Sequence, residues 1–296
     1  MISKNEIAAY FRLLQDHICG ALEKADGKAK FEEDRWQREG GGGGRSRVIQ
    51  DGSLFEKGGV NFSEVHGKAP DFMKEKHDDA PGTFYATGVS IVIHPLSPMI
   101  PIIHLNVRYL ELGNRIWFGG GIDLTPVYFH EEDVRFFHRQ LKSVCDRFSP
   151  EFYPRFKSWA DDYFYIVHRN ETRGAGGIFF DHLEPDTEFP LNRLFEFVKA
   201  VGESFVPVYL ELVSRNRDAG YGEKEKQWQS IRRGRYAEFN LVYDRGTKFG
   251  LETGGRTESI LMSLPPLAAW KYDYRPDENS DEARTLGYLK KAIGWI

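Results

Sequence analysis

The sequence predicts an α+β fold, in which α-helices pack against a large and mainly antiparallel β-sheet. The expected strands occur in consecutive groups. Several connections between them are too short for a crossover helix, so neighbouring strands must run antiparallel. Segments with helical periodicity lie before and after these groups. No linker divides the chain after residue 45, so the 296 residues are expected to form a single domain over 1–296.

The first expected element is a helix over 5–24. Its apolar residues recur at spacings of three and four: Ile7, Phe11, Leu14, Ile18 and Leu22. The segment 25–44 is polar and ends in the run Gly40–Gly44, which predicts a loop and a candidate hinge or lid. The domain is therefore divided into an N-terminal helix and polar segment over 1–34 and a core over 35–296.

Strands are expected to follow from residue 45. The pair Asp51-Gly52, between Arg47–Gln50 and Ser53–Lys57, predicts a β-hairpin. Further strands are expected at 60–65, 84–93, 101–112, 115–118 and 177–180. Helices are expected at 131–147, 151–169, 191–215 and 223–234. The last elements are strands at 236–243 and 249–253, separated by a turn at 244–247, and a short helix at 257–264.

Composition excludes several classes of protein. The formal charge is 40 − 44 = −4, which gives no general attraction for nucleic acid. No apolar run approaches the roughly 20 residues that cross a bilayer. Two cysteines, Cys19 and Cys145, cannot form a disulfide framework. The first residues resemble neither a secretory signal nor a mitochondrial presequence, so a cytoplasmic location is expected.

The segment Pro101–Leu112 alternates between apolar and polar residues, as a strand with two different faces does. One face is expected to carry Ile103, Leu105, Val107 and Tyr109. The other is expected to carry His104, Asn106 and Arg108. These three side chains combine a titrating group, an amide and a guanidinium that binds carboxylates, which favours a functional surface over an ordinary solvated one.

A second alternating segment, Tyr236–Tyr243, is expected to lead into a turn at Asp244 and Arg245. Asp244 is interpreted either as a turn residue that accepts backbone N–H groups or as a carboxylate aimed at a ligand. The segment Gly254-Gly255-Arg256 is either a plain turn or an anion site built from backbone N–H groups and a guanidinium. The glycine clusters match neither a phosphate loop nor a dinucleotide-binding pattern.

The nine histidines contain no His-x-His or His-x-x-x-His pair, so no local metal motif is present. Four of them lie on separate expected elements and can meet only through the fold: His94, His104, His138 and His168. Each is either a hydrogen-bonded structural histidine or a metal ligand.

Five long runs together resemble one family: RWQREGGGGGRSRVIQDGSLFEKGGVNFS, IWFGGGIDLTP, DDYFYIVHRNETRGAGGIFFDHL, RRGRYAEFNLVYDRGTKFGL and GGRTESILMSLPP. They are similar to the oxygen-dependent coproporphyrinogen III oxidases from about residue 35 to the C-terminus. The resemblance implies a large antiparallel sheet with helices on both faces, and a homodimer. Many relatives read FFDD where this chain has Phe179-Phe180-Asp181-His182, which leaves Asp181 as the only carboxylate there.

The resemblance implies an enzyme of haem biosynthesis that converts coproporphyrinogen III to protoporphyrinogen IX. Two propionates, on rings A and B, become vinyl groups, while oxygen is consumed and carbon dioxide and hydrogen peroxide are released. No organic cofactor is implied, and oxygen is a co-substrate. The family is described both with a divalent metal and without one, so the need for a metal stays open.

Positions in the matching motifs imply the site residues. His104 matches the proton donor, and Asp244 and Arg245 match residues implicated in catalysis, with Asp244 expected to hold the pyrrole N–H groups and take a proton from one. Substrate contacts are implied for seven residues: Ser90, Asn106, Val107, Arg108, Gly254, Gly255 and Arg256. The implied metal ligands are His94, His104, His138 and His168. The segment from about 236 to 271 corresponds to a region linked to dimerisation.

Two other functions stay open from the sequence. One is a metal-dependent oxygenase that uses the four histidines, and the other is a non-catalytic tetrapyrrole binder. The combined match of His104, Asp244 and Arg245 favours an enzyme over a carrier. The expected partners are therefore coproporphyrinogen III, oxygen and a second copy of the chain, without nucleic acid or a membrane span.

Overall fold

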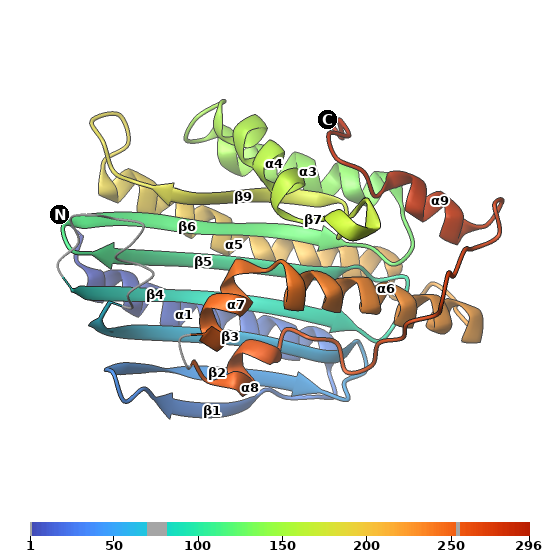
Figure 1. The fold of residues 1–296 in the computed structure, drawn as a ribbon, viewed down its shortest axis with the longest axis horizontal. Helices are drawn as coiled ribbons and strands as arrows, with labels where there is room; N and C mark the ends of the chain where they lie inside the picture. The colour runs from blue at the N-terminus through green and yellow to red at the C-terminus, as the bar shows by residue number, and fades with distance from the viewer. Residues whose placement is uncertain (1, 70–81, 253–254) are drawn as a thin grey trace.

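The computed structural model describes residues 2–69, 82–252 and 255–296, and one large sheet forms its centre (Figure 1). Seven strands pair antiparallel in the order β1-β2-β3-β4-β5-β6-β9. Their bounds are Glu32–Gln37, Gly42–Gln50, Phe55–Lys68, Thr83–Pro95, Ile102–Leu112, Arg115–Thr125 and Gly176–Leu183. The antiparallel sheet with its helices confirms the predicted α+β class.

Helices cover both faces of the sheet. In Figure 1 they lie behind it as α1 (Lys4–Asp26) and α5 (Leu191–Asn216), and in front of it as α6 (Glu223–Val242), α7 (Arg245–Glu252) and α8 (Thr257–Leu261). We call the face under α1 and α5 the apolar face and the opposite one the polar face. The helix α4 (Phe152–Tyr163) packs on β9 at one edge of the sheet.

The remaining elements are short or peripheral. The helix α3 (Glu131–Asp146) packs against α5, and α9 (Asp281–Tyr288) lies near the C-terminus. After α4 come the short paired strands β7 (Tyr165–Ile166) and β8 (Glu171–Thr172), joined by a 3₁₀ turn at Val167–Arg169. No helix in the described part of the chain combines the length and apolarity needed to cross a membrane.

The hydrophobic core lies on the apolar face, between the sheet and helices α1 and α5. Phe11 of α1 and Phe205 of α5 belong to one buried cluster with strand residues such as Leu105 and Ile122, all of them fully buried. Burying each of these side chains contributes roughly 1.5–3 kcal/mol to folding. The predicted alternation of β5 is confirmed, because its apolar residues face this core.

The first helix is fixed at both ends. Ser3 and Glu6 form a capping box at its start, in which the Ser3 hydroxyl accepts from the Glu6 N–H at 3.3 Å. At its end, the Asp26 carboxylate accepts the N–H groups of Leu54 and Phe55 in the β2–β3 turn, at 2.8 and 3.0 Å. Burial opposes the charge, but these bonds lower the Asp26 pKa to about 2. A buried carboxylate thus ties α1 to the predicted hairpin.

Two predicted strands are helices. The segment 236–243 continues α6 to Val242, and 249–252 belongs to α7, while Thr253 lies outside the described residues. Buried positions Tyr236, Ala237, Phe239 and Asn240 follow helical spacing, so the apolar alternation did not reflect a strand. No Gly or Pro interrupts α6 between Arg235 and Val242. The predicted strand at 236–243 is therefore wrong, and Asp244 follows a helix instead of a strand.

The N-terminal polar segment also differs from its prediction. Glu32–Gln37 forms the edge strand β1, and Gly42–Gly44 begin β2 instead of forming a loop. The glycines are needed because the two strands approach closely: a Cβ on Gly43 would lie 2.2 Å from the Trp36 carbonyl oxygen. The proposed hinge or lid at Gly40–Gly44 is therefore mostly part of the sheet.

Candidate active site

Three adjacent rows of residues run across the strands on the polar face, and they cross β5 near its middle. The cross-strand register sets one row as Gly59, Val92, His104, Asp123 and Gly177. The next row is Ser46, Asn61, Ser90, Asn106, Gly121 and Phe179. The third is Gly44, Ser63, Gly88, Arg108 and Gly119. Antiparallel pairing thus brings the predicted His104, Ser90, Asn106 and Arg108 onto one surface.

His104 is held by a buried carboxylate. Its Nδ1 lies 2.8 Å from Oδ1 of Asp123, directly across the β5–β6 pair, and Asp123 is 1% exposed. Burial raises the pKa of Asp123, but the charge of the adjacent Arg173 brings it below its ordinary range. An ionised Asp123 can only accept hydrogen bonds, so the Nδ1 of His104 carries the proton. The Nε2 atom is then the ring nitrogen left for a substrate.

Arg173 completes this buried group. Its Nη2 lies 2.7 Å from each oxygen of Asp123, and its Nη1 donates to the Asn240 side chain at 2.9 Å. The guanidinium lies 4.4 Å from the centroid of the Phe164 ring and 4.7 Å from that of Phe239. These contacts offset the cost of burying a charge, and they connect β6 to α6.

Arg108 lies two residues along the strand from Asn106. Its Nη1 donates to Oδ1 of Asn106 at 3.2 Å, and its Nη2 forms an ion pair with Oδ2 of Asp181 at 2.9 Å. The Arg108 side chain is 31% exposed, whereas Val107 is fully buried on the apolar face. A side-chain contact between Val107 and a ligand on the polar face is therefore ruled out by the alternation of β5.

Asp244 and Arg245 lie in the helical layer instead of at the end of a strand. Oδ2 of Asp244 accepts the Thr247 N–H at 2.7 Å at the start of α7, and Oδ1 accepts the Tyr163 hydroxyl at 2.9 Å. The Tyr163 ring stacks on Phe179 of the second row, with centroids 4.0 Å apart. Tyr163 thereby links Asp244 to the polar face.

The remaining predicted anion site is only partly described. Arg256 forms an ion pair with Asp34 of the edge strand β1, and the Gly255 N–H donates to the Gly250 carbonyl at 2.8 Å. Gly254 lies outside the described residues. Arg256 is partly exposed and precedes α8, whose Ser259 contacts Ser46 and Asn61 of the second row.

The structure does not bring the four predicted metal ligands together. His138 uses both ring nitrogens within the fold, bonding the Tyr153 hydroxyl and the Ala175 carbonyl. His168 likewise bonds Tyr243 and Glu238, while His94 bonds the Ser263 carbonyl. Burial lowers the pKa of both His94 and His138 to about 3, so both are neutral. No group of three or more His, Cys, Asp or Glu suited to a metal occurs among the described residues.

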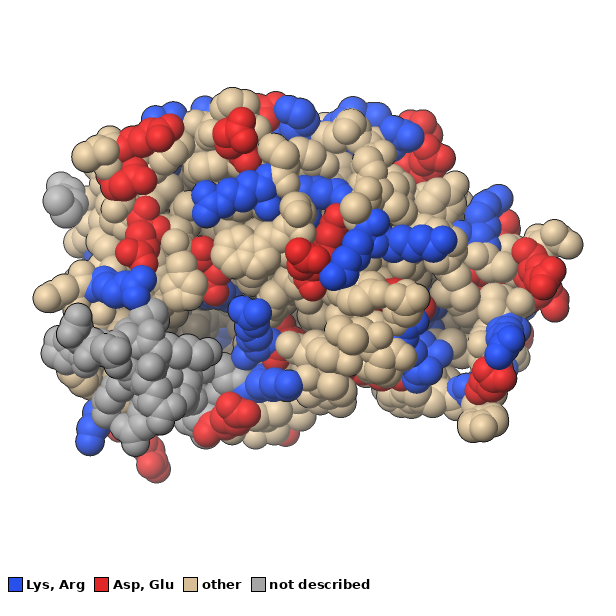
Figure 2. Space-filling model, turned by 45° about the horizontal axis from the view of Figure 1, so that its top comes forward, with Lys and Arg blue, Asp and Glu red and all other residues tan. Residues whose placement is uncertain are grey.

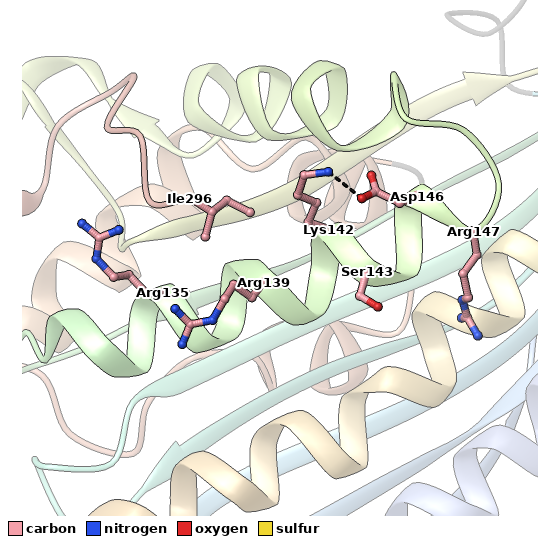
Figure 3. Close-up of a pocket in the computed structure, with 7 residues that line it drawn as sticks. All are labelled: Arg135, Arg139, Lys142, Ser143, Asp146, Arg147 and Ile296. Atoms are coloured by element: carbon pink, nitrogen blue, oxygen red, sulfur yellow. Dashed lines mark hydrogen bonds and ion pairs between the residues drawn. The ribbon is translucent and has the colours of Figure 1, made fainter.

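The molecular surface offers other features to compare with this region. Figure 2 shows lysine and arginine side chains interspersed with acidic ones on the face drawn, which is typical of a solvated surface. An open pocket of about 700 Å³ lies beside α3 and the C-terminus (Figure 3). It is lined by Arg135, Arg139, Lys142, Ser143, Asp146, Arg147 and Ile296, none of which belongs to the polar face.

Asp123 and Arg173 are site residues that the sequence interpretation missed. A strand that ends at Phe118, followed by Gly119–Gly121 as a separate glycine cluster, puts Asp123 outside the predicted sheet. Extending that strand through the glycines gives an alternation that puts Asp123 on one face with Gly119 and Gly121. Arg173 follows a short strand pair and has no comparable signal in the sequence.

Comparisons with known proteins show which family the chain resembles along almost its whole length. The model of the coproporphyrinogen III oxidase family matches residues 6–295. An oxygen-dependent coproporphyrinogen-III oxidase from Prochlorococcus marinus (strain NATL2A) is 48% identical over 307 residues, covering 96% of this chain and 88% of the relative.

Proposed function

The chain belongs to the coproporphyrinogen III oxidase family, and we propose that it converts coproporphyrinogen III to protoporphyrinogen IX with oxygen as the oxidant. Each round turns one propionate into a vinyl group. The carboxyl group leaves as carbon dioxide, and the side chain loses one more hydrogen with its bonding electrons. Oxygen takes up those two electrons and two protons to form hydrogen peroxide. Two rounds, on rings A and B, complete the reaction.

The observation that carries this proposal is the set of complementary side chains on the polar face around β5. His104 with its Asp123 partner can supply or take a proton at Nε2, and Arg108 offers a guanidinium to a carboxylate on the same strand. Both groups stand beside Ser90 and Asn106. A substrate that carries several propionates on pyrrole rings needs this combination of cation, amide and proton-transfer group.

Asp244 is proposed to bind the pyrrole N–H groups and to accept a proton from one of them, which makes the ring electron-rich enough to react with oxygen. Its support is the Tyr163 hydroxyl, which fixes the carboxylate near the second row of the polar face. Arg245 and Arg256 are proposed to neutralise carboxylates that stay bound. Among the described residues the histidines form no group suited to a metal, so no step is assigned to a metal.

A homodimer that uses the segment 236–271 is also proposed. Among the described residues of that segment, five large apolar side chains are exposed: Leu241, Val242, Leu251, Leu267 and Trp270. Their concentration in one segment supports the proposal that a second copy of the chain covers this surface. The cytoplasmic location remains a prediction.

The proposed function is tested by incubating metal-assayed, chelator-treated protein with coproporphyrinogen III, with and without oxygen, and separating the products by chromatography. The proposal expects vinyl products only when oxygen is present. Product that appears only after a metal is restored supports the metal-dependent oxygenase instead. Bound substrate without any product supports the tetrapyrrole carrier.

A further inference from the structure

Arg108 is already paired with a carboxylate of the protein itself. Asp181 lies on β9, two strands away from β5, and its Oδ2 atom is 2.9 Å from Nη2 of Arg108. Gly119 of the intervening strand β6 makes room for this pair. A Cβ there would lie 2.6 Å from Oδ1 of Asp181 and 2.7 Å from Nε of Arg108. The missing side chain thus lets the pair reach across a whole strand.

A β-bulge directs Asp181 toward Arg108. Phe118 pairs with Leu183 and Gly120 pairs with Phe180, so Gly119 alone stands opposite two residues of β9. The second of these, His182, has a φ of 47° and stacks on Trp117 of the polar face, with ring centroids 5.2 Å apart. The bulge therefore places two consecutive side chains on the polar face, where a regular strand would place one.

Asp181 also has a second anchor of its own. Its Oδ1 accepts the N–H of His182 at 3.0 Å, so the carboxylate stays ordered even when its contact with Arg108 changes. The side chains of Arg108 and Asp181 are 31% and 21% exposed, so both can be reached from solvent. A charged pair that is open to solvent exchanges partners far more easily than a buried one such as Arg173 and Asp123.

We infer that the Asp181 carboxylate and a substrate carboxylate alternate as the ion-pair partner of Arg108. This inference rests on the proposed function, in which Arg108 receives a propionate. A substrate that reacts twice at the same catalytic atoms must turn between the two rounds, so its retained carboxylates must leave their guanidinium partners. Asp181 re-forms its ion pair with Arg108 as the propionate leaves, so the guanidinium is not left without an anion.

The experiment compares Asp181→Asn with the wild type in single-turnover reactions, with enzyme in excess over coproporphyrinogen III. The first decarboxylation should keep its rate, and the second should slow by about threefold or more, because the propionate no longer meets a competitor on Arg108. Affinity for coproporphyrin, a non-reacting probe followed by fluorescence, should rise by a similar factor. Glu184→Gln is the matched control. Glu184 lies three residues after Asp181 and also forms an ion pair with an arginine, Arg115.

Other outcomes separate the two proposals. Weaker coproporphyrin binding by Asp181→Asn, or equal slowing of both rounds, would mean that Asp181 only orients Arg108 and would overturn the inference. Unchanged binding and rates would overturn it as well. Failure of the wild type to convert coproporphyrinogen III would instead refute the proposed function. The coproporphyrin affinities of wild type, Asp181→Asn and Arg108→Ala would still test the exchange directly.

Discussion

The candidate site has two halves that are built differently. On the sheet side, His104, Asp123 and Arg173 form a chain of contacts whose last two members are almost fully buried. On the helical side, Asp244 and Arg256 are held by single side-chain partners, Tyr163 and Asp34. The sheet half is therefore part of the folded core, whereas the helical half is attached to it. Substitutions in the first should reduce both stability and activity, and those in the second activity alone.

The largest effect is expected from Asp123→Asn. The amide no longer fixes the His104 tautomer, and kcat should fall by roughly a hundredfold or more, as in other His–Asp pairs. Arg173 would lose its buried anion, which costs about 3–5 kcal/mol of unfolding free energy. Steady-state kinetics and urea unfolding measure the two effects.

Asp161→Asn is the matched control for this variant. Asp161 is also buried and pairs with Lys157 at 2.5 Å, but it lies outside the polar face. It should lower stability and leave the kcat of the folded protein unchanged. A normal kcat in Asp123→Asn would contradict the role given to the sheet half.

A smaller effect is expected from Arg256→Ala in the helical half. Loss of one guanidinium that binds a propionate should raise KM about tenfold, since a hydrogen bond to a charged group contributes roughly 1.5–3 kcal/mol. The melting temperature should stay the same, because an exposed ion pair contributes little to stability. Arg275→Ala, at an arginine that is 82% exposed and pairs with Asp273, is the control. An unchanged KM would remove Arg256 from the substrate site.

As the pH falls, the fold should lose stability first through its buried histidines and only later through its carboxylates. His94 and His138 have an ordinary pKa of 6.5, and burial lowers it to about 3 in the fold. The unfolded chain therefore binds protons first, and stability is lost as the pH falls below about 6.5. At pH 5 each histidine should cost about 2 kcal/mol.

Urea unfolding at pH 7 and pH 5 measures this loss. Asp26 and Glu238 carry a pKa of about 2 in the fold, so their stabilisation is lost only at lower pH, progressively between their ordinary values near 4 and about 2. His138→Gln should remove about half of the difference between pH 7 and pH 5. Equal stability at the two pH values would show that these histidines are not kept neutral by burial.

The sheet was more predictable than the helical layer for a physical reason. In β5 the alternation of His104, Asn106 and Arg108 with fully buried neighbours is a direct consequence of one face lying on the core. The segment 236–243 shows the same alternation, yet it is the end of α6, because helical contacts of Tyr236 and Phe239 decide its structure. Pattern alone does not contain those contacts.

Two other failures have different causes. The edge strand β1 is almost wholly polar and mostly exposed, so it gives no apolar alternation to detect. Glycine runs normally indicate turns, but here Gly42–Gly44 and Gly119–Gly121 lie within strands. The reason at Gly119, close approach of the Arg108–Asp181 pair, requires contacts between three strands that no local pattern records.

The most direct test of the two-part site is the turnover of coproporphyrinogen III by Asp244→Asn, measured with its melting temperature. The two-part site predicts that activity falls at least tenfold while the melting temperature stays within a degree or two of the wild type, since asparagine keeps a side-chain oxygen for the Thr247 N–H and caps a helix about as well as aspartate does. Full activity at an unchanged melting temperature would contradict it, because the sheet half alone would then carry the reaction.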